Sequence, residues 1–254
     1  MSREVKASGD LRTALITGVG HAEGIGWAVA LRLSAAGYRL ALHAYEDDAP
    51  QLAAQAAPDP GGPPRESAIH LRGDFADPEV PERVVAAAAD QLGHIDVLVV
   101  NHTRSVRQGL GELTAEEIDL SLAINVRASL LLVQAFHARH DGRPGGRIVL
   151  MTSGQHRGPM PGELPYIAGK GALHQLTRSL AEAAAPKRIT VNTVDPGATD
   201  TGWPDEATYQ WVLERQPFGR WGEPEDAARL IGFLCSEDAG WITGQVITSA
   251  GGGP

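Results

Sequence analysis

A tyrosine and a lysine four residues apart, Tyr166 and Lys170, are the residues of this sequence best suited to proton transfer. On a helix this spacing places both side chains on one face, so the phenol and the ammonium group can meet. A free tyrosine has a pKa near ~10, and a fixed cation nearby favours the phenolate and lowers that pKa. We therefore expect a proton-transfer pair. The alternative is a surface pair that arose by chance, because the motif is short.

Ser153 lies thirteen residues before this tyrosine and follows the apolar run 147–152. Such a run is typical of a buried strand. In open α/β sheets, ligands bind at the carboxyl ends of the strands. We therefore expect the Ser153 hydroxyl and the Tyr166 phenol to act on the same substrate oxygen.

A glycine-rich segment follows the first predicted strand, residues 13–17, and opens a helical pattern that ends at Gly37. Its glycines Gly18, Gly24 and Gly26 would let the backbone approach a pyrophosphate, while the helix N-terminus supplies amides and a favourable dipole. The place of this segment in the first strand-helix-strand unit favours a nucleotide site over a turn that is merely tight.

The rest of the chain alternates strand and helix patterns. Strands are predicted at 39–45, 68–73, 97–101, 147–152, 190–195 and 245–248, and helices at about 49–57, 78–92 and 225–235. Thr114 and Glu117 have the spacing of a capping box for a long helix to residue 139, and the Tyr166 helix ends near residue 184. These units predict an α/β fold in one domain over residues 1–254: a doubly wound, seven-stranded parallel sheet of Rossmann type in a three-layer α/β/α sandwich.

Composition excludes several classes of function. The 254 residues are 43% hydrophobic, which is enough for a large core, and their net charge of -9 opposes binding to nucleic acid or anionic lipid. We read no apolar run near the ~18 residues of a membrane span, so we expect a soluble, cytoplasmic protein without a membrane partner. The single cysteine, Cys235, is expected to be a small core residue. Nine histidines show no close ligand pair at helical spacing, so no metal site is expected.

Taken together, these motifs resemble the short-chain dehydrogenase/reductase family over nearly the whole chain. The cofactor turn of that family is similar to Thr17-Gly18 and Gly24-Ile25-Gly26, and its catalytic set matches Ser153, Tyr166 and Lys170. Further matches are Asn125-Val126, Pro196-Gly197 with Thr201, residues 219–226, and Thr243-Gly244. Within the family, the pattern looks most like bacterial 3-oxoacyl-acyl-carrier-protein reductases and related carbonyl reductases.

The resemblance implies an oxidoreductase that interconverts a ketone and a secondary alcohol, with a small-molecule substrate for which a 3-oxoacyl thioester is one candidate. Tyr166 would be the general acid or base, Lys170 would lower its pKa and bind the nicotinamide ribose, and Ser153 would hold the substrate oxygen. Asn125 would anchor a water relay. The implied cofactor contacts are Gly18, Gly24, Ile25, Gly26, Tyr45, Asp74, Phe75, Asn101, Tyr166, Lys170, Pro196, Gly197, Thr199 and Thr201. The alternatives are that Asn125 satisfies backbone groups in its helix and that Asp74 caps a turn.

The sequence departs from the family pattern in two places. Five residues separate Gly18 from Gly24 where the family has three, so we expect a bulged loop around residues 21–23. After the fourth strand, the usual Asn-Asn-Ala-Gly motif keeps only Asn101, and His102 is expected near the active-site floor. The candidates for substrate contact are Gln155, His156 and Trp203, with Tyr209 and Trp211 near them, and the aromatic residues could instead pack as a lid.

A protein that binds the cofactor without turnover, as a sensor or scaffold, is the alternative class. Retention of both Tyr166 and Lys170 favours the enzyme. Dehalogenase relatives replace the lysine, and enoyl reductases space the two residues further apart. Relatives assemble as tetramers, and the small-residue face of Ala168, Gly169 and Ala172 with Leu173 and Leu176 suits helix packing across a two-fold axis, so a homotetramer is expected, with a dimer as the fallback.

The cofactor is expected to be NAD(H) or NADP(H), and electrostatics favours NAD(H). The selecting positions read Ala44, Tyr45 and Glu23, which match neither the Asp of NAD-using relatives nor the Arg of NADP-using relatives. Carboxylates at residues 23 and 46–48 would oppose a 2′-phosphate within a Debye length of ~8 Å. Against this, His43 or His21 could partly neutralise such a phosphate.

Overall fold

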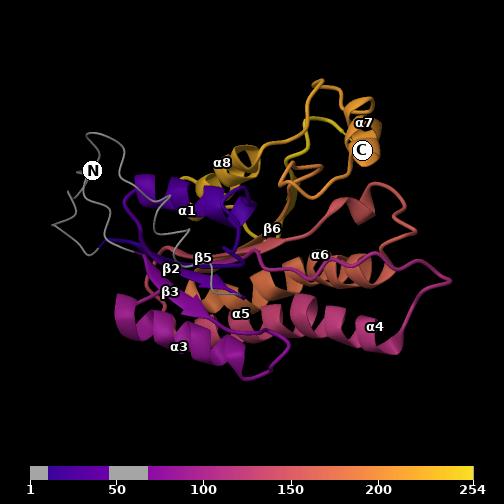
Figure 1. Cartoon of the computed structure of the whole chain (residues 1–254). Coiled ribbons are helices and arrows are strands. Elements are labelled where there is room, and N and C mark those ends of the chain that lie inside the picture. Colours follow the sequence, from indigo (N-terminus) through magenta and orange to yellow (C-terminus); the bar gives the residue numbers. More distant parts are fainter. Residues whose placement is uncertain (1–10, 46–67, 254) are drawn as a thin grey trace.

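Seven parallel strands form the centre of the protein (Figure 1) in a computed structural model that describes residues 11–45 and 68–253. The sheet order is β3-β2-β1-β4-β5-β6-β7. The strands are β1 (Thr13–Thr17), β2 (Arg39–Ala44), β3 (Ile69–Arg72), β4 (Val97–Val100), β5 (Gly146–Met151), β6 (Ile189–Asp195) and β7 (Val246–Thr248). Each neighbouring pair is parallel, so the predicted doubly wound sheet is confirmed, with strand bounds within one residue of the predicted ones.

Helices cover both faces of this sheet, as a three-layer sandwich requires. Figure 1 shows α1 (Ile25–Ala35) and α8 (Pro224–Cys235) together on one face. The other face carries α3 (Val80–Leu92), α4 (Ala115–Leu122), α5 (Ser129–Arg139) and α6 (Leu164–Ala184). Alternate residues of β1 supply the two cores: Ile16 packs on the α1 side and Leu15 on the α5 side. Cys235 is buried as expected, and burial raises the pKa of its thiol to about 12.

The long helix differs from its prediction at both its start and its middle. Thr114 caps α4 by accepting a hydrogen bond from the Glu117 amide, but the Glu117 carboxylate turns to Arg104 and Ser121. The Thr114 half of the predicted capping box is therefore confirmed. The Glu117 half is wrong, because Arg104 and the buried Ser121 bind its carboxylate away from the helix end. A π-helical segment, Ala123–Ala128, then separates α4 from α5. One further helix, α7 (Glu206–Leu213), was not expected, and the helix predicted at about 49–57 lies outside the described residues.

Residues 115–139 together are long and apolar enough to cross a membrane, with a mean hydropathy of 1.4 over the best window, contrary to our reading of the sequence. This statement about crossing a membrane rests on the length and composition of the helix alone. The buried residues Leu132, Val133 and Phe136 belong to the core beneath the sheet, and α5 packs on α3. This packing is that of a core helix.

Four segments that carry candidate residues begin at or near the carboxyl ends of strands. Residues 18–26 follow β1, 101–106 follow β4, 153–157 follow β5 and 196–201 follow β6. From β1 the chain builds the sheet outward through β2 and β3, and from β4 it builds the other half. The crevice at such a switch point is where open α/β sheets bind ligands, so the fold brings these segments to one place.

Candidate active site

The glycine turn after β1 is built so closely that side chains would not fit. Gly18 has φ +71°, and a Cβ there would lie 2.6 Å from the Cα of His102. A Cβ on Gly26 would lie 2.7 Å from both the side-chain nitrogen Nδ2 of Asn101 and the carbonyl oxygen of Gly18. Within the five residues that separate Gly18 from Gly24, the expected loop at residues 21–23 is closed by a hydrogen bond from the Gly24 amide to the His21 carbonyl. These glycines leave the backbone exposed to a ligand at the N-terminus of α1.

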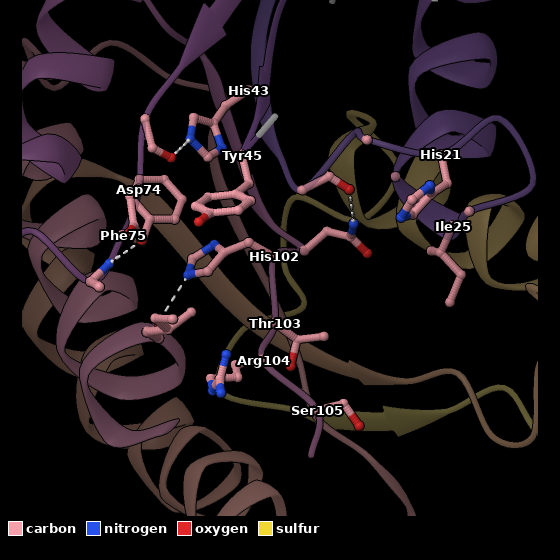
Figure 2. A pocket seen from close by; sticks show the side chains of 18 of the residues that line it. His21, Ile25, His43, Tyr45, Asp74, Phe75, His102, Thr103, Arg104 and Ser105 are labelled. Carbon is pink, nitrogen blue, oxygen red and sulfur yellow. Dashed lines mark hydrogen bonds between the residues drawn. The ribbon is translucent and has the colours of Figure 1, made fainter. Parts of the chain in front are cut away.

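A cavity of about 640 Å³ opens beside this turn (Figure 2). Its walls come from the glycine turn, from the ends of β2 and β3, and from the segment after β4. Of the expected cofactor contacts, those that line it are Gly18, Gly24, Ile25, Gly26, Tyr45, Asp74, Phe75, Asn101 and Thr201. Sequence reasoning missed other lining residues, among them Gly73, Arg104, Ser105, Val106, Leu120 and Ile124. Their position just after β3 and β4, or on the long helix, is the only signal that the sequence offers for them.

Five expected cofactor contacts do not line this cavity: Tyr166 and Lys170, which are described below, and Pro196, Gly197 and Thr199. Thr199 is buried, its hydroxyl donates to the Pro196 carbonyl, and its backbone pairs with Gly222. Gly197 has φ +66°, and a Cβ there would lie 2.5 Å from the Cβ of Ala250. In the structure these residues hold the segment after β6 against the end of the chain.

Asn101 and Asp74 line the cavity, and the side chain of each also makes a hydrogen bond within the protein. The Asn101 amide group donates to the Gly18 carbonyl over 2.9 Å and ties the end of β4 to the glycine turn. The Asp74 carboxylate accepts from the Ala76 amide over 2.8 Å, which is the turn-capping alternative that the sequence left open. Both side chains nevertheless face the cavity.

Three aromatic rings pack against one another beside the cavity (Figure 2): His43 is stacked on Phe75, and His102 is tilted against it. The Phe75 ring lies 4.1 Å from that of His43 and 4.4 Å from that of His102, between centroids. Burial lowers the pKa of His43 to about 4, so it is neutral at pH 7, and its Nε2 bonds the Gly73 carbonyl. His43 is therefore not the cation that was considered for a 2′-phosphate.

His102 is buried and lines this cavity. Burial lowers its pKa to about 3, so the imidazole is neutral. Its Nε2 lies 3.1 Å from the Ile124 carbonyl and must donate, which leaves Nδ1 to accept from the Thr17 hydroxyl over 2.9 Å. The ring thus links β1 to the π-helical segment.

Asn125, within that segment, is only 1% exposed. Its side-chain oxygen accepts from the Arg104 amide over 2.8 Å, and its side-chain nitrogen donates to the Arg104 carbonyl over 2.9 Å. Arg104 in turn forms two hydrogen bonds with Glu117, of 2.8 and 2.6 Å. The side chain therefore satisfies backbone groups of a neighbouring loop, and its role in a water relay stays a prediction.

Ser153, Tyr166 and Lys170 come together as predicted. Ser153 follows β5 in an extended conformation, and its hydroxyl hydrogen-bonds to the Tyr166 phenol. Lys170 lies one turn further along α6, is buried, and donates from Nζ to the Met151 carbonyl over 3.1 Å. The Lys170 Nζ lies 5.8 Å from the Tyr166 ring centroid. None of the three lines the cavity beside the glycine turn.

The pKa values of this pair differ from the expected direction. Burial raises the pKa of Tyr166 above its usual value, and the hydrogen bond with Ser153 offsets this only in part. Burial also lowers the pKa of Lys170 to about 8. We expected Lys170 to lower the tyrosine pKa. In the structure the loss of water around both groups dominates, because it disfavours their charged forms.

The expected substrate contacts lie at two places. Gln155 donates to the Thr152 hydroxyl over 3.0 Å, and His156 lies 3.1 Å from the Ser153 carbonyl, so both border the serine. Trp203 is 53% exposed, with its ring centroid 6.2 Å from that of Trp221.

The other two aromatic residues of this region belong to α7. Tyr209 stacks on the buried Trp221 at 5.1 Å, which is the lid-packing alternative. Trp211 is exposed, and the Arg215 guanidinium lies 4.5 Å from its ring centroid. The structure gives neither of them a position beside Ser153.

A buried ion pair near the serine was missed. Asp195, at the end of β6, accepts from Arg157 over 2.8 Å and from the Gly197 amide over 2.9 Å. The acid before Pro196-Gly197 was visible in the sequence, but nothing there pointed to Arg157 as its partner.

Comparison with known proteins identifies related chains. Residues 18–253 match the family model described as enoyl-(acyl carrier protein) reductase. The chain is 42% identical over 181 residues to an uncharacterised oxidoreductase of Bacillus subtilis, covering 70% of this chain and 72% of that one. It is 34% identical over 249 residues to human dehydrogenase/reductase SDR family member 4, covering 96% of this chain and 87% of that one.

Solved structures of related proteins also resemble this chain in sequence and fold. A short-chain dehydrogenase from Burkholderia cenocepacia, in complex with NADP, is 35% identical with a TM-score of 0.85, over 95% of this chain and 97% of that one. A blue fluorescent protein from a metagenomic library, in complex with NADPH, is 30% identical with a TM-score of 0.83, over 96% of this chain and 98% of that one.

Proposed function

Because the chain belongs to the short-chain dehydrogenase/reductase family and is an NAD(P)-dependent oxidoreductase, we propose that it interconverts a ketone and a secondary alcohol at Ser153, Tyr166 and Lys170. The observation that carries this proposal is that the three side chains come together: the Ser153 hydroxyl lies near enough to the Tyr166 phenol to lower its pKa, and the buried Lys170 Nζ is 5.8 Å from the ring centroid. The Ser153 hydroxyl after β5 and the Tyr166 hydroxyl on α6 are thereby positioned to meet one substrate oxygen.

The glycine turn and the cavity beside it fit a nicotinamide nucleotide. Gly18 and Gly26 leave no room for a Cβ, which is what a backbone that cradles a pyrophosphate needs. The cavity of about 640 Å³ lies within the usual ~300–1,000 Å³ of ligand pockets. A nucleotide bound there would supply hydride to, or accept it from, the substrate carbon.

The protein residues supply the proton chemistry. In reduction, Tyr166 donates its phenolic proton to the carbonyl oxygen while the Ser153 hydroxyl orients that oxygen. The raised pKa of Tyr166 keeps the phenol protonated at neutral pH, as a general acid requires. The Lys170 ammonium favours the phenolate that remains. In oxidation, the same phenolate accepts the proton from the alcohol.

The substrate is proposed to be a carbonyl compound, with a 3-oxoacyl thioester as a specific candidate. The matching family model is named for enoyl reduction, whereas Tyr166 and Lys170 keep the four-residue spacing that resembles carbonyl reductases. A direct comparison of acetoacetyl and crotonyl thioesters, together with simple ketones, separates these chemistries by the rate of nucleotide oxidation. Reduction of the crotonyl thioester alone contradicts the carbonyl proposal.

The variant Tyr166→Phe tests the proposed role of the phenol. It is expected to lose ~10²- to 10⁴-fold in kcat, because it removes the general acid, while the dissociation constant of the nucleotide changes little. The two are measured by steady-state kinetics and by fluorescence titration. Near-normal turnover in this variant would show that the proton comes from another group. Absence of turnover in the wild-type protein with every carbonyl substrate would favour the sensor or scaffold class.

The choice of nucleotide needs a test of its own, since the comparisons do not support the expected preference for NAD(H). Both solved relatives described above hold NADP or NADPH, and residues 46–48 lie outside the described residues. Of the expected carboxylates, the described part of the chain contains Glu23, which is exposed on the glycine turn. If Glu23 repels a 2′-phosphate, Glu23→Gln raises kcat/KM with NADPH several-fold and leaves that with NADH unchanged. An equal effect on both nucleotides contradicts this role.

A further inference from the structure

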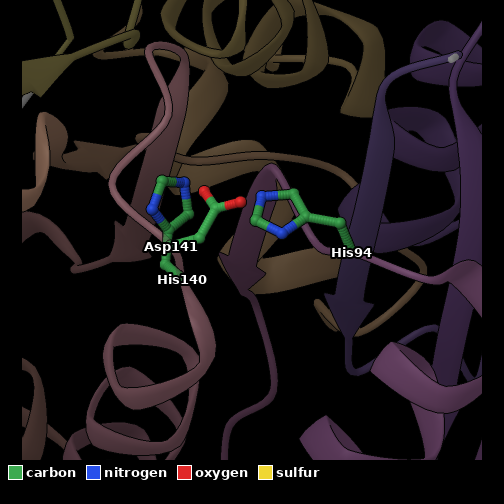
Figure 3. Close-up of side chains that lie close together, drawn as sticks. All are labelled: His94, His140 and Asp141. Atoms are coloured by element: carbon green, nitrogen blue, oxygen red, sulfur yellow. The ribbon is translucent and has the colours of Figure 1, made fainter.

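Two histidines from different connections meet at the edge of the sheet opposite the nucleotide cavity. His94 lies between α3 and β4, and His140 lies between α5 and β5. Because β4 and β5 are parallel neighbours, their amino-terminal ends are side by side, and Figure 3 shows the two imidazoles facing each other there. The ring centroids are 4.9 Å apart. Tyr166 and the glycine turn lie at the carboxyl ends of the strands, so this cluster is separate from the proposed active site.

Both imidazoles have a buried nitrogen that lacks a partner. The Nε2 atoms of His94 and His140 make no hydrogen bond within the described residues, and His140 is only 2% exposed. A buried polar atom without a partner costs free energy of folding, so such atoms generally have a ligand, an ion or water. Figure 3 shows the Asp141 carboxylate between the two rings. One possible ligand atom from each of these three residues lies within 4.8 Å of the others.

The chemistry of the cluster suits a transition metal. Burial lowers the pKa of both histidines, so the imidazoles are neutral at pH 7, the form that binds metals. Asp141 is held ionised by Arg143, which donates to its carboxylate over 2.7 Å. A second carboxylate is close, since Asp96 Oδ1 lies 3.7 Å from His94 Nε2. Two imidazoles and two carboxylates make up a donor set that Zn²⁺ accepts in tetrahedral geometry.

We propose that His94, His140 and Asp141 bind Zn²⁺, with Asp96 as the fourth ligand, and that the ion clamps the α3–β4 connection to the α5–β5 connection. Ligand atoms ~2.0–2.1 Å from zinc in a tetrahedron lie about 3.3 Å apart, so the donors must move together from their present positions. The turn after His140 contains Gly142 and Gly145, with φ values of +87° and +108°, and glycine can adopt backbone conformations that other residues rarely adopt.

Zinc binding has a defined local cost. His140 Nδ1 accepts a hydrogen bond from the Gly142 amide over 3.1 Å, which places the ring proton on Nε2. Coordination through Nε2 moves that proton to Nδ1 and breaks the bond to Gly142. Arg143 also places a positive charge beside the ion, as an outer partner of Asp141. The turn at 141–145 therefore changes conformation when the ion binds.

The test measures metal binding to the whole chain, without reference to turnover. After treatment with EDTA, the protein is titrated with Zn²⁺ by calorimetry and with Co²⁺ by visible absorption, and thermal unfolding is followed with and without Zn²⁺. We expect one ion per chain, a tetrahedral Co²⁺ spectrum and a higher Tm with Zn²⁺. His94→Ala and His140→Ala are expected to abolish all three signals. His137→Ala is the matched control, because His137 lies on α5 outside the cluster, and it is expected to behave as the wild type.

Asp141→Asn tests the site even if the histidine variants fail to fold, because Asp141 is exposed and its replacement is expected to leave the fold intact. It is expected to weaken Zn²⁺ binding more than about tenfold, because even an outer-shell partner contributes about 10- to 100-fold. If the wild-type protein binds no zinc, the proposal is wrong, and the Nε2 atoms of His94 and His140 are hydrogen-bonded to water instead. Binding that survives in Asp141→Asn and in folded His94 and His140 variants would also overturn it. These outcomes are independent of the proposed oxidoreductase activity.

Discussion

Lys170 is a buried cation whose Nζ donates to the Met151 carbonyl, and burial lowers its pKa to about 8. Below that pH the side chain is charged and favours the phenolate that forms when Tyr166 releases its proton. Above it, the amine is neutral and this stabilisation is lost. The raised pKa of Tyr166 keeps the phenol protonated over the same range, so the two groups titrate separately.

Ketone reduction is therefore expected to slow as the pH rises above about 8. For the free enzyme, kcat/KM should fall by up to about tenfold per pH unit through one ionisation. Lys170→Met is expected to be slow at every pH and to lack this decline. The measurement is the pH profile of kcat/KM at fixed ionic strength. A flat wild-type profile through this range would exclude Lys170 as the titrating group.

At the scale of elements, the π-helical segment Ala123–Ala128 brings the long helix to the proposed active site. Its Asn125 is bound to the loop after β4, and a Cβ on Gly169 of α6 would lie 2.8 Å from the Asn125 Cβ. π-helical turns are rare and occur often at functional sites. Here the irregular turn places Asn125 between that loop and the helix that carries Tyr166 and Lys170.

His102 ties this segment to β1, and we predict that the tie positions Asn125. His102→Phe keeps a ring against Phe75 but removes the bonds to Ile124 and Thr17. We expect kcat to fall about tenfold, because small displacements near reacting groups are costly. His43→Phe is the matched control, because His43 also packs against Phe75 but has no bond to the segment.

Steady-state kinetics and thermal unfolding of both variants separate positioning from stability. If His43→Phe and His102→Phe lower Tm and kcat by equal amounts, the link to Ile124 has no role beyond stability.

For the whole molecule, a homotetramer stays a prediction. The structure leaves fewer residues of the expected small-residue face available for contact between subunits. Gly169 and Leu173, two members of the expected small-residue face, are already buried within the chain. Ala168 is exposed, and Ala172 and Leu176 are partly exposed, so these three remain for contact with a second copy. A cytoplasmic location and the lack of membrane or nucleic-acid partners likewise stay predictions from composition.

Light scattering of the eluted protein tests the assembly. The expected mass is four times the 26.8 kDa of one chain, with a dimer as the fallback. Ala168→Arg is expected to reduce the mass, since it places like charges across a two-fold axis. Gln91→Arg, exposed on α3, is the control and should not change it. A wild-type mass of one chain contradicts the prediction.

Local spacing was enough to predict the fold and the cluster of proposed catalytic residues. The strands follow from apolar runs, and the side chains of Tyr166 and Lys170 lie near one another because a helix repeats about every 3.6 residues. The glycine turn is similarly readable, since its residues are adjacent in the chain and its close approach to His102 requires glycine.

Tertiary structure decided what depends on distant residues and on water. The Glu117 carboxylate binds Arg104 instead of completing a capping box, because the loop after β4 folds onto α4. The pKa of Tyr166 is raised although Lys170 is near, because burial depends on the whole fold around them. His94 and His140 lie 4.9 Å apart between ring centroids only because β4 and β5 pair in parallel. Helical periodicity carries no information about such encounters, so a search for ligands at helical spacing overlooked them.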